Sequence, residues 1–132
     1  MSKNPVVHFE MPYKNAKRVS EFYKKAFGWD MNDAGPDMGG YVVAVTAETD
    51  KDRMVKTPGT INGGFYPLKT APKSNEPSVV ISVPDIKEAV KNVKAAAGKI
   101  LREPQDIPGI GLWVSFEDSE GNRVSILQAN NS

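Results

Sequence analysis

The sequence has no cysteine, only one histidine and no long apolar run among its 132 residues. Without cysteine there is no disulfide framework, no thiolate catalysis and no cysteine-ligated zinc or iron–sulfur site. No apolar run approaches the length of a membrane span, and the N-terminal residues MSKNP lack the apolar core of a signal peptide. We therefore expect a cytoplasmic protein with no membrane partner.

The chain also lacks an excess of charge of either sign, with 17 basic against 16 acidic side chains. Its lysines follow candidate helix faces and loops, and no basic stripe with interleaved aromatic residues is present, so a nucleic-acid partner is not expected. Hydrophobic residues make up 39% and charged residues 25%, which is ordinary for a soluble globular protein. The length favours one domain over residues 1–132.

What is present is an internal repeat. PVVHFEMP at residues 5–12 and PSVVISVPD at residues 77–85 are both apolar strands that end at a proline and lead into a helical pattern. Alternation in the first strand puts Phe9 and Met11 on one face and His8 and Glu10 on the other.

The elements that follow have the same order in both copies, which lie about 72 residues apart. Asn15 is expected to cap the first helix and Gly28 to end it; Asp85 opens the second helix and Gly98 ends it. The strands are expected at residues 29–32, 41–47 and 60–66 in the first copy and at 99–103, 112–117 and 123–128 in the second, with a turn-rich loop at 104–111.

Each half thus reads β-α-β-β-β, which predicts an α+β fold of two tandem modules, approximately residues 5–67 and 77–128. Each helix covers one face of its module's sheet. The other faces are expected to form one curved sheet around a cleft, because each half alone would leave a face uncovered.

The two modules, the opening HFEMP, FYKKAFGW at 22–29 and FEDSEGNRVSILQ at 116–128 resemble the vicinal oxygen chelate superfamily. This glyoxalase-like group contains glyoxalase I, bleomycin resistance proteins and extradiol dioxygenases, and the resemblance covers nearly the whole chain. It implies the fold, a cleft site and a homodimer. It does not single out one activity, because the superfamily hosts isomerases, dioxygenases, metal-dependent transferases and simple drug-binding proteins.

The resemblance also implies where a metal would be bound. The family's ligand positions fall on Val6, Ser78, Ser125 and a residue within 62–65, and none of these offers an imidazole or a carboxylate. We therefore expect no metal and no other cofactor. The alternative is an alignment shifted by two residues, in which His8 and Glu10, with Gln128, form an atypical divalent-metal site of a lyase, isomerase or dioxygenase.

His8 and Glu10 lie on one strand face with backbones about 7 Å apart. Their functional interpretation is a ligand-facing pair, with His8 as base or hydrogen-bond donor and Glu10 fixing its tautomer. The other interpretation is a core histidine satisfied by a carboxylate or a carbonyl group. For catalysis we favour the second interpretation, so no catalytic residue is assigned; for lining a pocket we favour the first.

The remaining candidates are small polar or aromatic residues on or beside strands. An aromatic side chain could stack on a flat ligand, Gly63-Gly64 would leave room for one or mark a bulge, and residues 105–111 could form a rim or lid. The cleft-lining candidates are His8, Glu10, Tyr41, Phe65, Ser78, Ser82, Trp113, Ser125 and Gln128.

The function predicted from the sequence is metal-free binding of a small, aromatic or drug-like molecule in the cleft. A purely structural domain is a third alternative, and it would require the cleft to be filled by side chains.

Overall fold

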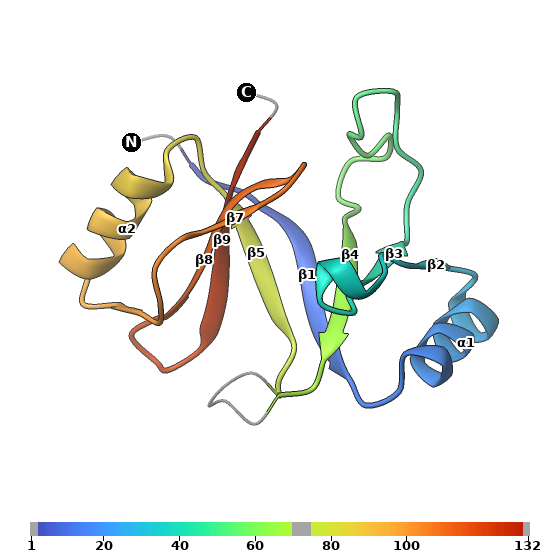
Figure 1. Ribbon diagram of the computed structural model, residues 1–132. Coiled ribbons are helices and arrows are strands. Elements are labelled where there is room, and N and C mark those ends of the chain that lie inside the picture. Colours follow the sequence, from blue (N-terminus) through green and yellow to red (C-terminus); the bar gives the residue numbers. More distant parts are fainter. Residues whose placement is uncertain (1–2, 70–74, 131–132) are drawn as a thin grey trace. The chain divides into compact units, whose positions relative to one another are not determined.

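The computed structural model describes residues 3–69 and 75–130. The chain forms two compact units (Figure 1). The first unit is His8–Pro77, and the second unit combines residues 1–7 with Ser78–Ser132. Strand β1 begins in the second unit and continues into the first.

The described residues of the first unit form one α-helix and four strands of the sheet. Its strands are ordered β2-β3-β4-β1; β1 runs parallel to β4, and the other neighbours are antiparallel. The elements in chain order are β1 (Val6–Tyr13), α1 (Ala16–Phe27), β2 (Asp30–Asp33), a 3-10 turn (Pro36–Met38), β3 (Val42–Val45) and β4 (Asn62–Pro67).

Helix α1 begins and ends where the sequence predicts. The Asn15 side chain accepts a hydrogen bond from the Arg18 amide at 2.8 Å, and Gly28 takes a left-handed conformation with φ of 72°. Both are the usual local signals for helix ends, because they satisfy backbone groups that the helix leaves unpaired. Among the described residues, no helix is long and apolar enough to cross a membrane.

The core of the first unit lies between α1 and one face of the sheet. Val42, Ala44 and Phe65 are at most 1% exposed, and α1 covers them with Val19 and Tyr23. The predicted alternation in β1 is confirmed, because Phe9, Met11 and Tyr13 pack against this core. The even-numbered residues of β1 therefore point to the opposite face.

The second unit repeats this plan with one strand more. Its strands are ordered β5-β9-β8-β6, and β5 runs parallel to β9; β7 pairs with β8. The elements are β5 (Ser78–Ser82), α2 (Ile86–Ala95), β6 (Lys99–Ile100), β7 (Gln105–Ile107), β8 (Gly111–Glu117) and β9 (Arg123–Ala129). The core under α2 contains Val83, Ile86, Val114, Phe116 and Ile126. The predicted α+β class with two βαβββ modules is confirmed.

The structure differs from the prediction at residues 104–111, where the sequence indicates only a loop. Gln105–Ile107 forms β7, an antiparallel partner of β8 with Gln105 opposite Trp113. This strand has three residues between two prolines, so it is too short to show alternation and its flanks read as turns. Its backbone hydrogen bonds tie Gln105–Ile107 to the sheet, which leaves these three residues unsuited to being a lid.

The end of α2 also differs from the prediction. The left-handed residue is Ala97, with φ of 69°, and not Gly98. Gly98 is needed for another reason: a Cβ there would lie 2.6 Å from a Val93 methyl carbon and 3.1 Å from the Glu117 carbonyl oxygen. The glycine thus permits close packing of the helix end on β8.

This arrangement predicts that Ala97→Gly stabilises the protein, whereas Gly98→Ala destabilises it. A left-handed alanine costs about 1–2 kcal/mol, which glycine would relieve. The greater conformational freedom of glycine in the unfolded chain offsets roughly half of this gain in stability. We expect Ala97→Gly to raise the free energy of unfolding by about 0.5–1 kcal/mol, measured by urea denaturation. An Ala97→Gly variant no more stable than the parent would contradict this.

Candidate functional site

The face of the first unit's sheet that points away from α1 carries the polar residues of β1. We call this side the open face, defined by His8, Glu10 and Tyr41 with Gly64 beneath them. In the register of the sheet, Glu10 lies beside Gly64, and Gly64 lies beside Val43. Gly64 on β4 therefore lies between Glu10 on β1 and Val43 on β3, the strand that follows Tyr41.

Tyr41 reaches across this strand because residue 64 has no side chain. A Cβ at Gly64 would overlap the Tyr41 ring, with 1.9 Å to Oη and 2.1 Å to Cζ. The expected space at Gly63-Gly64 is thus taken by protein side chains, since a Cβ at Gly63 would likewise meet the Phe9 ring at 2.4 Å. Glycine at position 64 thus lets Tyr41, which precedes β3, contact residues of β1.

The phenol of Tyr41 connects His8 to Glu10. Tyr41 Oη lies 2.9 Å from His8 Nε2 and donates a hydrogen bond to Glu10 Oε2 at 3.2 Å. The His8 and Tyr41 rings are nearly parallel, at 18° with centroids 6.5 Å apart. Glu10 is 8% exposed, whereas His8 and Tyr41 are half-buried. In the functional interpretation of the sequence, Glu10 fixes the tautomer of His8; in the structure Glu10 reaches His8 through Tyr41.

The environment keeps both ring groups in their neutral forms. Burial lowers the pKa of His8 below its usual value. Burial and the negative charge and hydrogen bond of Glu10 raise the pKa of Tyr41 well above its usual value. Loss of the phenol proton would place two negative charges side by side in a poorly solvated place. At neutral pH the open face therefore presents an imidazole and a phenol.

The other candidate of the first unit does not join this face. Phe65 is 1% exposed and packs under α1, where its ring contacts those of Tyr23 and Phe9. It belongs to the core that supports the open face from below.

Three candidates of the second unit form hydrogen bonds with other residues of that unit. Ser125 is fully buried and shares a hydrogen bond of 3.1 Å with Ser115. Gln128 Oε1 accepts a hydrogen bond from the Ile86 amide at 2.9 Å and so helps to cap α2. The Ser82 amide donates to the Pro5 carbonyl group at 2.9 Å.

Two further candidates of this unit differ in their surroundings. Trp113 is half-buried on β8, with the Arg123 guanidinium carbon 5.9 Å from its ring centroid. Among the described residues, the hydroxyl oxygen of Ser78 is buried and has no hydrogen-bond partner. In the part of the chain that the structure describes, no base is hydrogen-bonded to Ser78, as a serine nucleophile would require.

The divalent metal that the family resemblance implies would need several converging donor side chains. Within residues 3–69 and 75–130, no three histidine, aspartate or glutamate side chains gather closely enough to hold an ion. His8 and Glu10 are both hydrogen-bonded to Tyr41, and a phenol with a strongly raised pKa is a poor metal ligand. A stable site needs several converging imidazoles or carboxylates. These residues do not fit a metal.

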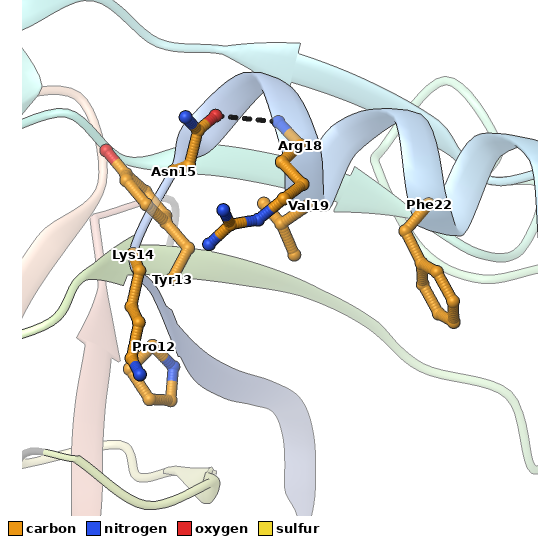
Figure 2. Close-up of a pocket in the computed structure, with 7 residues that line it drawn as sticks. All are labelled: Pro12, Tyr13, Lys14, Asn15, Arg18, Val19 and Phe22. Carbon is orange, nitrogen blue, oxygen red and sulfur yellow. Dashed lines mark hydrogen bonds between the residues drawn. The ribbon is translucent and has the colours of Figure 1, made fainter.

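A shallow surface pocket lies at the start of α1 and does not include the open-face residues. Its lining consists of Pro12, Tyr13, Lys14, Asn15, Arg18, Val19 and Phe22 (Figure 2). Asn15 already accepts the hydrogen bond of the Arg18 amide there. A capped helix start of this kind is explained by helix formation alone, so the open face remains the candidate site.

Comparison with known proteins gives a family and a fold. The sequence pattern of the Glyoxalase/Bleomycin resistance protein/Dioxygenase superfamily matches residues 6–126. No curated protein matches the sequence.

Solved structures of the same fold cover almost the whole chain at low identity. A hypothetical protein from Bacillus halodurans C-125 has a TM-score of 0.67 and 18% identity, covering 99% of this chain and 98% of its own. Methylmalonyl-CoA epimerase of Streptomyces coelicolor, in complex with 2-nitronate-propionyl-CoA, has a TM-score of 0.69 and 12% identity, with 98% and 99% covered. At these identities the likeness concerns the fold alone.

Proposed function

Because the chain belongs to the Glyoxalase/Bleomycin resistance protein/Dioxygenase superfamily, we propose that it binds a small organic molecule at the open face without a metal ion. The observation that carries the proposal is the hydrogen-bonded chain His8–Tyr41–Glu10. It orients an imidazole and a phenol on the sheet face that α1 leaves uncovered.

The chemistry of these side chains favours a flat, largely neutral ligand. Two nearly parallel rings offer apolar surface at their faces and hydrogen-bonding atoms at their edges. Binding sites of this kind combine apolar contact area with a few polar groups that fix the orientation of the ligand. A small aromatic molecule matches both properties.

Absence of a metal requirement is tested first, by elemental analysis of protein purified without an affinity tag. We expect well below one equivalent of any divalent ion, and no change in the NMR signals of His8 on addition of Zn²⁺ or Mn²⁺. One tightly held ion per chain that is lost in His8→Ala would overturn the proposal and support a metal-dependent lyase, isomerase or dioxygenase.

Binding itself is tested with a library of small aromatic compounds, followed through the resonances of the single histidine. Loss of one good polar contact and of ring contact is worth at least about 1.4 kcal/mol, which is tenfold in affinity. We expect hits to bind at least about tenfold more weakly to His8→Ala. The matched control is Lys24→Ala, at an exposed position of α1, the helix that packs on the opposite face of the sheet. Equal affinities for the two variants would contradict a site at His8.

A further inference from the structure

We infer that the chain Glu10–Tyr41–His8 makes the open face selective for ligands that present an N–H or O–H donor, which His8 Nδ1 accepts. This inference rests on the proposed function and names the ligand class of the same site. It assigns Tyr41 and Glu10 as positioning residues that act through His8.

The direction of the hydrogen bonds follows from the number of protons available. Tyr41 Oη has one proton, and it donates that proton to the Glu10 carboxylate. An ionised carboxylate only accepts. The contact of 2.9 Å between Tyr41 Oη and His8 Nε2 is then satisfied only if Nε2 donates. A neutral His8 therefore carries its proton on Nε2 and has a lone pair on Nδ1.

Tyr41 is held firmly enough to impose this direction. Its carbonyl oxygen accepts a hydrogen bond from the Ala34 amide at 2.8 Å, and its own amide donates to the Met38 carbonyl group at 3.3 Å. Its ring occupies the space above Gly64. With backbone and ring both fixed, the phenol cannot turn away from His8 and Glu10 without breaking several contacts.

The second ring nitrogen of His8 is left for a ligand. Within the described part of the chain, the contact with Tyr41 is the one hydrogen bond that His8 makes. The ring is half-buried and burial lowers its pKa, so Nδ1 stays unprotonated near neutral pH. Such a nitrogen accepts a hydrogen bond and has none to donate. Phenols, indoles and other neutral N–H or O–H donors are the matching ligands.

The tautomer is measured first, by ¹⁵N NMR of the full-length protein at neutral pH, where the single histidine leaves no ambiguity of assignment. We expect the proton on Nε2. In Tyr41→Phe the group that accepts the Nε2 proton is gone, so the fraction with the proton on Nδ1 should rise. Lys24→Ala, at an exposed position of α1, should match the parent. A dominant Nδ1–H form in the parent, or an unchanged ratio in Tyr41→Phe, would overturn the inference.

The ligand class is tested with two matched pairs of probes, indole with 1-methylindole and phenol with anisole. Each pair differs by methylation of the donor, so we expect the donor to bind about tenfold more tightly to the parent, corresponding to one hydrogen bond. In His8→Ala this preference should fall to about one, because the acceptor is gone.

The outcomes separate the inference from the proposed function. Equal binding of both members of each pair to the parent, or a preference that persists in His8→Ala, overturns the donor selectivity and leaves the binding site intact. If no probe of either pair binds the parent, the proposed function and the inference both fail for this ligand class.

Discussion

Replacement of Phe65 by alanine is expected to lower the free energy of unfolding by about 3–5 kcal/mol. The ring is 1% exposed at the centre of the first unit, between Met11 and Val42 in the register of the sheet. It also forms aromatic pairs with Tyr23 at 5.2 Å and Phe9 at 6.3 Å between centroids. The variant would therefore lose buried apolar area and ring contacts together and leave a cavity under the open face.

Phe22 on α1 is the matched control for Phe65. It is the same residue type in the same unit but is 57% exposed. Truncation there should change the free energy of unfolding by less than about 1 kcal/mol. Urea denaturation of both variants followed by circular dichroism gives the comparison, and similar losses for Phe65→Ala and Phe22→Ala would contradict the assignment of the core.

A single methyl group at Gly64 is expected to cost about 1–3 kcal/mol from overpacking, with the lost hydrogen bonds in addition. The Cβ would lie 1.9 Å from Tyr41 Oη and 2.2 Å from Cε2, so the ring has to leave its position. Both hydrogen bonds of the phenol would be broken, and Glu10, at 8% exposure, would lose a donor. We therefore expect Gly64→Ala to impair ligand binding as well as stability.

A double-mutant cycle isolates the cause of this effect. In a Tyr41→Ala background the clash disappears, and Gly64→Ala should be close to neutral, because alanine is no worse than glycine within a strand. The coupling energy between the two positions should thus reach at least about 1 kcal/mol, measured by urea denaturation of all four proteins. Additive effects would show that Tyr41 does not need the space above Gly64.

The secondary structure was predictable to the extent that local signals determine it. Asn15, Gly28 and Asp85 act at helix ends through contacts within a few residues, and alternation in β1 separates Phe9 and Met11 from His8 and Glu10. Strand β7 was not predictable because its three residues, between two prolines, are too few to show alternation, and its pairing with β8 decides it. The left-handed Ala97 was missed because glycine usually takes that conformation.

The open face was predictable only in part. Tyr41 could be suspected as an aromatic residue near a strand, but its role between His8 and Glu10 depends on the pairing of β1 with β4 and of β4 with β3. No local pattern encodes that register. The clue within the sequence was Gly64, since a glycine inside a strand often marks the close approach of another group. Here the group is a side chain of the same unit.

Strand β1 also determines how the chain can be divided. The second unit is discontinuous: residues 1–7 complete it, and the Pro5 carbonyl group accepts the hydrogen bond of the Ser82 amide. A gene fragment that starts at the repeat boundary near residue 78 encodes a sheet that lacks this partner. The two repeats therefore cannot be exchanged or separated as independent units. We expect a circular permutation that keeps β1 intact to preserve the fold better than a cut between the repeats.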